Sequence, residues 1–299
     1  PMQVLSEGAT HDVRIRSIQS QGRATEGLLS GQRAALNLVG VDHDQIHRGD
    51  AVVELARWRP TRRLDASLSV LESLDHEVSR RGAYLAYFGS GEFPVRVRVL
   101  GPESLRPGST GAVRLHLSRS LPLLPGDRYI LRESGRNETV GGGEVLDVAP
   151  VLPASRARPT RSVDRVIAER GWVDADELEA ITGERRDPLV GRWVTTEREV
   201  EFVLARVRSA VVDAGPLGLD VALLGDRERA VLPRASELSV SGGRVRPAAQ
   251  ASTVMEHPYV EVARAGGFAP PSPEGVDRAT LRELVKGGTL VEREGVYFH

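Results

Sequence analysis

Three consecutive glycines stand at a point where a chain could hold phosphate. Gly141 to Gly143 follow a predicted strand in which Tyr129 and Leu131 are apolar, and they precede the apolar Val145. Glycine-rich loops bind phosphate when they open onto a helix N-terminus. Here the glycines lead into EVLD, which does not predict a helix. We therefore interpret the triplet as a turn of a β-barrel, where glycine supplies unusual backbone angles.

The sequence lacks the lysine that nucleotide sites need. A P-loop requires G-x-x-x-x-G-K-[ST], whereas the only lysine, Lys286, is followed by Gly287. The guanine-reading N-K-x-D element fails for the same reason. We expect this chain neither to bind nor to hydrolyse GTP, and we find no catalytic and no cofactor-binding residues in it.

Acidic residues and histidines gather in one segment, DHDQIH, from Asp42 to His47. Such groups can bind metals, but the sequence offers no second cluster, and isolated polar runs usually face water. There are no cysteines, which excludes disulfides, thiolate metal sites and cysteine nucleophiles. We predict a solvated loop and no metal site.

Length and charge limit the possible functions. A chain of 299 residues is long enough for two or more domains. With 40 Lys and Arg against 41 Asp and Glu, the net charge is -1, so any RNA or DNA contact must be a local patch. We find no long apolar run and no signal peptide, and therefore expect a cytoplasmic protein without membrane contact.

Apolar and polar residues alternate through the first half, as in half-buried antiparallel strands. The segment VRVRV at 95–99 is an example, and turn sequences such as PGS and PGD separate such runs. Short strands with these turns are typical of barrels. We predict β domains over 1–53 and 54–149. A Pro- and Arg-rich linker should follow at 150–159, sensitive to proteases between 155 and 160.

After Thr160 the hydrophobic period changes to that of helices. Asp174 and Gly183 carry the signals that begin and end one helix, and Gly242-Gly243 predicts a hairpin turn. Helices followed by a two-stranded hairpin follow the winged-helix plan. We predict three such domains, over 160–196, 197–248 and 249–299.

Particular segments resemble one family. Val13 to Val53, with GQRAALNLVG and the later RGD, closely resembles the second half of domain II of the bacterial selenocysteine-specific elongation factor, SelB. The segments RRGAYLAYFGSGEFPVRVRVLG and GDRYILRESGRNETVGGGEVLD resemble its domain III, which implies that the glycine triplet belongs to the closing strands of a β-barrel. The tail, GFAPPSPEGVDRATLRELVKGGTLVEREGVYFH, is similar to one of its winged helices.

The resemblance implies a multidomain fold of elongation-factor β-barrels followed by winged helices. In the family a GTPase domain comes first, so the chain would begin inside an incomplete domain II and stop before the last winged helix. GTP and magnesium would bind the first domain, and the selenoprotein mRNA hairpin would bind the last. The implied partners are selenocysteyl-tRNA and the ribosome, and we expect a monomer.

Arg33, in Gly31-Gln32-Arg33, matches an arginine that the family places in its selenocysteine pocket. A selenol ionises more readily than a thiol, and a guanidinium favours that anion over a serine hydroxyl. The alternative is a surface arginine that pairs with Glu26 or with nothing. The other charged pocket residues would lie on the opening strand of the barrel, so we expect an incomplete pocket.

A second function class is a DNA-binding regulator, in which the winged helices would bind DNA and the β-rich part would be a sensing domain. The helix after Asp277 carries Arg278, Arg282 and Lys286, but Asp277 and Glu283 offset them. This small surplus is poorly suited to binding phosphates. The barrel motifs favour the elongation factor.

Overall fold

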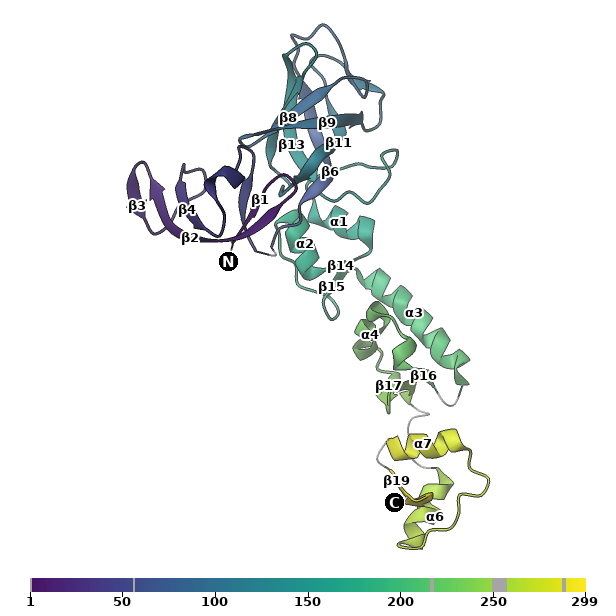
Figure 1. The fold of residues 1–299 in the computed structure, drawn as a ribbon. Helices are drawn as coiled ribbons and strands as arrows, with labels where there is room; N and C mark the ends of the chain where they lie inside the picture. The colour runs from purple at the N-terminus through teal and green to yellow at the C-terminus, as the bar shows by residue number, and fades with distance from the viewer. Residues whose placement is uncertain (1, 56, 216–217, 249–256, 287–288) are drawn as a thin grey trace. The chain divides into compact units, whose positions relative to one another are not determined.

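The computed structural model describes residues 2–55, 57–215, 218–248, 257–286 and 289–299 (Figure 1). The chain divides into two compact units, Pro1–Asp187 and Pro188–His299. No helix in the described ranges is both long enough and apolar enough to cross a membrane.

The first unit begins with a five-stranded antiparallel sheet. Its strands are β1 (Met2–Leu5), β2 (Thr10–Ser20), β3 (Arg23–Thr25), β4 (Ala35–Val39) and β5 (Ala51–Glu54). The order is β3-β2-β1-β5, and β4 also pairs with β2. Val4, Val13 and Val53 are buried, whereas Leu36 and Val39 on β4 are exposed. Within the described residues this sheet does not close, in agreement with the predicted incomplete barrel.

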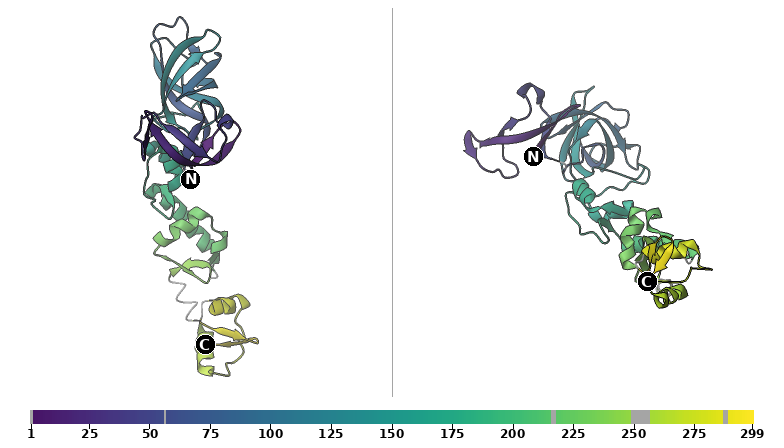
Figure 2. Two further views of the ribbon diagram at one scale, coloured as in Figure 1. Left: turned by 60° about the vertical axis from the view of Figure 1, so that its left-hand side comes forward. Right: turned by 60° about the horizontal axis from the view of Figure 1, so that its bottom comes forward.

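The next six long strands form a closed barrel, visible as a ring in Figure 2. They are β6 (Thr61–Val70), β8 (Tyr84–Phe88), β9 (Gly91–Val99), β11 (Thr110–Leu121), β12 (Arg128–Glu133) and β13 (Glu138–Asp147). Two short strands, β7 (Val78–Ser79) and β10 (Ser104–Leu105), pair with each other. Alternate residues point inward, so that Leu64, Leu68, Leu115 and Leu131 are fully buried. The predicted barrel is confirmed.

The glycine triplet lies inside β13, the last strand of the barrel. This is where the family resemblance places it, whereas the residues alone suggested a turn. Gly141 and Gly142 pair with β6, at Val70 and Ser69. A Cβ on Gly142 would lie 2.6 Å from the Tyr129 carbonyl oxygen, and one on Gly143 would overlap the Ser67 carbonyl oxygen. The triplet therefore allows β13 to approach both of its neighbours closely, because glycine has no side chain.

Residues 150–159 connect the barrel to the first helices without forming a helix or strand. Ala154 and Ala157 are nevertheless buried, and they pack with Leu100 of the barrel. The backbone amides of residues 156 and 157 both donate to the Pro153 carbonyl oxygen. The segment is therefore a connection that packs against the barrel, which argues against the expected sensitivity to proteases.

The helices after this segment are α1 (Val163–Arg170) and α2 (Ala175–Thr182), separated by β14 (Trp172–Asp174). The Asp174 carboxylate accepts from two amides in the first turn of α2, and Gly183 ends the helix with a φ of 73°. Both ends of α2 are as predicted. A side-chain cap at Ser162 begins α1 in the same way.

Ion pairs join these two helices to the β part of the first unit. Arg165 on α1 contacts Asp147 at the end of β13, at 2.9 Å. Arg59 forms an ion pair with Glu177 on α2. The boundary between compact units therefore follows α2, at Asp187/Pro188, and falls inside the predicted 160–196 domain.

The second unit contains two further groups of helices and strands. The first has β15 (Trp193–Thr195), α3 (Glu197–Asp213), β16 (Leu219–Asp220), α4 (Asp226–Val231), β17 (Leu238–Ser241), β18 (Arg244–Pro247) and short 3-10 helices at Val221–Leu223 and Leu232–Arg234. The predicted apolar face of α3 is buried at Val200, Val203, Leu204, Val207 and Val211. Gly242 and Gly243 have φ values of 58° and 79°, so the predicted hairpin turn between β17 and β18 is confirmed.

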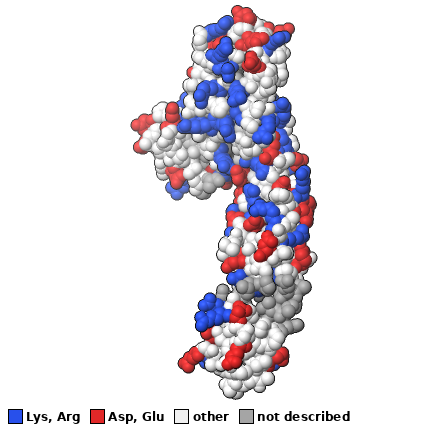
Figure 3. Space-filling view, turned by 90° about the vertical axis from the view of Figure 1, so that its right-hand side faces the viewer, with Lys and Arg blue, Asp and Glu red and all other residues white. Residues whose placement is uncertain are grey.

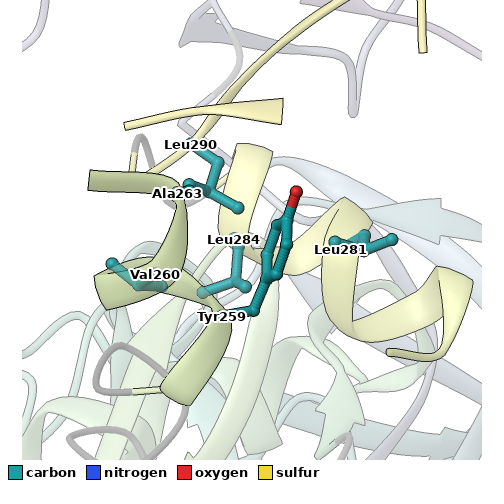
Figure 4. Packing of buried hydrophobic residues seen from close by; sticks show 6 residues of the cluster. All are labelled: Tyr259, Val260, Ala263, Leu281, Leu284 and Leu290. Atoms are coloured by element: carbon teal, nitrogen blue, oxygen red, sulfur yellow. The ribbon is translucent and has the colours of Figure 1, made fainter. Parts of the chain in front are cut away.

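The last group consists of α6 (Pro258–Gly266), α7 (Arg278–Lys286), β19 (Val291–Arg293) and β20 (Val296–Phe298). Figure 4 shows its core, made of Tyr259, Val260, Ala263, Leu281, Leu284 and Leu290. The Tyr259 hydroxyl donates to the Pro271 carbonyl oxygen at 2.7 Å. Helices followed by a two-stranded hairpin fit the winged-helix plan.

Candidate functional site

The loop that carries Arg33 runs from β3 to β4 and is held by local hydrogen bonds. The Gln32 side chain accepts from the Leu29 amide at 2.9 Å, and the Ser20 hydroxyl donates to the Arg33 carbonyl oxygen at 3.0 Å. Gly31 has a φ of 83°, in the region that favours glycine. The sequence Gly31-Gln32-Arg33 thus fixes the backbone from which the guanidinium projects.

The Arg33 side chain is exposed. Among the residues that the structure describes, it forms no ion pair, and the alternative pairing with Glu26 is not made. The guanidinium is therefore available to an external anion. Whether that anion is an aminoacyl group stays a prediction.

The acidic and histidine-rich segment forms a short 3-10 helix, His43–Gln45. The Gln45 side chain accepts from the Asp42 amide at 3.0 Å, and the Asp50 carboxylate accepts from the His47 amide at 2.7 Å. Asp42, His43 and Asp44 are all exposed. In the part of the chain that is described, no group of three or more such side chains is arranged to hold a metal.

The Arg-Gly-Asp sequence at 48–50 connects the N-terminal sheet to the barrel. Arg48 donates to the Ser90 carbonyl oxygen at 2.6 Å. Arg119 of β11 donates to the Gly49 carbonyl oxygen at 2.6 Å and to the Asp50 carboxylate at 3.0 Å. A Cβ on Gly49 would lie 3.0 Å from the Gly91 Cα, so glycine is needed for this close approach. We call these contacts the Arg-Gly-Asp clamp.

Asp50 is the buried charge of the clamp, with its side chain only 2% exposed. Burial disfavours its charged form, but hydrogen bonds from the His47 amide, Ser6 and Arg119 outweigh this and hold the pKa of Asp50 below its ordinary value. The Arg119 guanidinium also lies 4.9 Å from the centre of the Phe93 ring. Sequence reasoning missed Arg119, because one arginine in an alternating strand gives no sign of a distant partner.

A family model described as "Selenocysteine-specific elongation factor, beta-barrel domain" matches residues 63–151. This range coincides with the closed barrel, which runs from β6 at Thr61 to the end of β13 at Asp147. The barrel of this chain therefore matches the β-barrel domain of selenocysteine-specific elongation factors. Its strands, its glycine triplet and the packed segment after β13 all fall within the matched residues or next to them.

Curated relatives are also elongation factors. The selenocysteine-specific elongation factor of Desulfomicrobium baculatum is 28% identical over 137 residues, covering 46% of this chain and 22% of that protein. Elongation factor Tu 2 of Streptomyces avermitilis is 32% identical over 151 residues, covering 47% and 37%. The Haemophilus influenzae selenocysteine-specific factor is 26% identical over 137 residues, covering 46% and 22%. The chain thus spans well under half the length of these relatives.

A solved structure has the same fold over most of the chain. It is the crystal structure of the bacterial selenocysteine-specific elongation factor EF-Sec, with a TM-score of 0.65 and 16% identity, covering 99% of this chain and 53% of that one. At this identity the likeness concerns the fold, and it includes the barrels and the winged helices. These four elongation factors give no support to the DNA-binding alternative.

Proposed function

We propose that the chain works in a selenocysteine-specific translation elongation factor, which delivers selenocysteyl-tRNA to the ribosome at recoded UGA codons. The observation that carries this proposal is the closed barrel, which coincides with the family match at residues 63–151. Within such a factor, the β domains of this chain would hold aminoacyl-tRNA, and its winged helices would extend toward the selenoprotein mRNA hairpin. The factor would act as a monomer.

Guanine nucleotide would bind elsewhere in such a factor. The residues present do not fit GTP and magnesium, because the sequence has a single lysine, Lys286, and no P-loop. In the described structure the glycine triplet lies in a barrel strand and opens onto no helix. The chemistry proposed for this chain is therefore recognition, without hydrolysis.

Arg33 is the residue that we assign to the selenocysteine end of the tRNA. Its guanidinium is exposed, its backbone is fixed by Ser20 and Gln32, and no acid neutralises it among the described residues. A permanent cation with directional donors binds a selenolate more tightly than a neutral hydroxyl. The assigned role is discrimination between selenocysteyl and seryl forms of one tRNA.

The test compares Arg33→Ala with wild type in the full-length, GTP-bound factor. We expect weaker binding of selenocysteyl-tRNA by about 1.5–3 kcal/mol, or roughly tenfold or more, and unchanged binding of uncharged tRNA. Arg33→Lys should restore part of the affinity, because it keeps the charge but loses the planar fork. Protection of the aminoacyl ester from hydrolysis measures the affinity for selenocysteyl-tRNA, and filter binding measures the affinity for uncharged tRNA.

Arg23→Ala is the matched control, since Arg23 is an exposed arginine of the neighbouring strand β3. It should bind both tRNA forms as wild type does. Equal affinity of wild type and Arg33→Ala for selenocysteyl-tRNA would remove Arg33 from the pocket. Failure of the wild type to prefer the selenocysteyl form would overturn the proposed function itself.

A further inference from the structure

A short irregular segment crosses one end of the closed barrel. It is the connection from β6 to β7, residues 71–77, which forms neither helix nor strand, and we call it the strap. Leu74 of the strap is buried, as is Val78 where β7 begins. The Leu71 amide donates to the Val140 carbonyl oxygen of β13 at 3.0 Å. The strap therefore covers part of the apolar core at the end of the barrel that carries the turn between β12 and β13.

Four charged or titratable side chains connect the strap to this turn. Asp75 and His76 belong to the strap, Glu133 is the last residue of β12, and Arg136 lies in the turn. His76 Nδ1 lies 2.8 Å from an Asp75 carboxylate oxygen, and His76 Nε2 lies 2.8 Å from a Glu133 carboxylate oxygen. Arg136 contacts the same two oxygens, at 3.1 and 3.8 Å. Figure 3 shows acidic and basic side chains close together at the top of the view, on the barrel. The imidazole ring and the guanidinium thus bridge the same two carboxylates.

The geometry around His76 requires both ring nitrogens to carry a proton. A carboxylate only accepts hydrogen bonds, and a neutral imidazole has a single N–H donor. With a carboxylate oxygen 2.8 Å from each nitrogen, a neutral ring would direct one lone pair at an anion. The doubly protonated ring donates to both carboxylates. Because the side chains of His76 and Glu133 are only 18% and 15% exposed, water has little access to replace these hydrogen bonds.

The charges that surround the ring favour its cation. The hydrogen bond to Asp75 is the largest influence and raises the pKa of His76, and Glu133 acts in the same direction. Burial and the Arg136 charge oppose them, but the pKa of His76 still lies above its ordinary value of 6.5. The same hydrogen bond, with Arg136, lowers the pKa of Asp75. Tyr84 of β8 lies opposite Glu133 in the strand register, and burial raises the pKa of its hydroxyl, so Tyr84 adds no charge to the cluster.

We propose that His76 is a pH-sensitive lock, which fastens the strap to the end of β12 when it is protonated and loosens the strap when it loses a proton to solvent. A neutral ring can donate to only one of the two carboxylates. Within the described ranges, Arg136 is then the only cation that contacts Asp75 and Glu133. The attachment of the strap is therefore weaker in the deprotonated state. This inference does not depend on the proposed function.

The pKa shifts of the two strap residues define the pH range of the lock. Because the pKa of His76 is raised in the closed strap, its contribution is fully present below about pH 6.5, the ordinary pKa that the ring regains when the strap opens. The contribution is lost as the pH rises through the higher pKa of the closed state. Because the pKa of Asp75 is lowered, its contribution is present above about pH 3.9 and is lost in stronger acid. The strap should thus be held most firmly between about pH 4 and pH 6.5, and should open more often as the pH rises.

Hydrogen exchange of the full chain from mildly acidic to mildly alkaline pH tests the lock, with rates corrected for the intrinsic pH dependence of exchange. The reporters are the amides of Leu71 and Leu74, which donate to the Val140 and Leu71 carbonyl oxygens. We expect both amides to lose protection as the pH rises through the pKa of His76. The loss should be at most about tenfold per pH unit, which is the limit for an opening that releases one proton.

His76→Gln removes the titration but keeps a side chain that can both donate and accept hydrogen bonds. In this variant the strap amides should exchange faster than in wild type at mildly acidic pH, and should lose no further protection as the pH rises. His43→Gln is the matched control, because His43 is an exposed histidine of the N-terminal part of the chain. It should show the same strap protection as wild type at every pH.

An NMR titration of His76 in the wild-type chain gives a second measurement that needs no variant. A pKa above 6.5, together with strap protection that falls over the same pH range, supports the lock. A pKa of His76 at or below 6.5 would overturn it, and so would wild-type strap protection that does not change with pH. A strap in His76→Gln that responds to pH as wild type does would also count against the proposal. Where His76→Gln does not fold, the two wild-type measurements still test it.

Discussion

Asp50 keeps a negative charge in a site from which solvent is almost excluded, and Arg119 is its cationic partner. Removing one member of a buried ion pair leaves the other uncompensated. We therefore expect Asp50→Ala to lower the free energy of unfolding by about 3 kcal/mol. Asp44→Ala, at an exposed carboxylate a few residues away, should change it by less than about 0.5 kcal/mol. Denaturant unfolding at neutral pH measures both.

The same carboxylate predicts a pH dependence. Because the pKa of Asp50 is lowered in the folded protein, its contribution is fully present above the unfolded pKa of about 3.9. It is lost as the pH falls through the lower, folded pKa. The difference in unfolding free energy between wild type and Asp50→Ala should therefore shrink at acid pH. A difference that stays constant down to about pH 2 would contradict this assignment of the charge.

At the scale of elements, β13 depends on a residue without a side chain. A Cβ on Gly143 would overlap the Ser67 carbonyl oxygen of β6, so Gly143→Ala should force these two strands apart. We expect a loss of about 3 kcal/mol in unfolding free energy, at the upper end of overpacking effects. Gly135 lies in the turn between β12 and β13, with open space where its Cβ would be. Gly135→Ala should be neutral, and equal stability of the two variants would show that β13 tolerates a wider spacing.

The elements themselves could largely be predicted from the sequence, because their signals are local. The alternation in VRVRV at 95–99, the cap at Asp174 and the turn at Gly242 each depend on a few neighbouring residues. The residues alone suggested a turn for the glycine triplet, and only the family resemblance implied a barrel strand, since that position depends on pairing with β6, about seventy residues earlier. Arg119 was missed for the same reason. Arg33 was found only through the family resemblance, and its role stays a prediction.

At the scale of the molecule, the division into compact units predicts where proteases cut. Arg156 and Arg158 lie on either side of Ala157, which is buried against the barrel. Arg185 and Arg186 lie in an irregular stretch just before the division at Asp187/Pro188. Proteolysis requires local unfolding, so trypsin should cleave after Arg185 or Arg186 first. Mass spectrometry of the early fragments identifies the first cleavage site. A first cut after Arg156 or Arg158 would instead support the predicted flexible linker at residues 150–159.

The closure of the barrel has a consequence for the order of events during synthesis. Strand β6 pairs with β11 and with β13, and both follow it in the chain. Its pairing with β13 joins Val70 to Gly141. A nascent chain therefore carries β6 with at least one edge unpaired until residues up to Asp147 have left the ribosome. Contacts of such long sequence separation form slowly, so the barrel should fold only after its last strand emerges, and a chaperone that covers apolar strands would act on it in that interval.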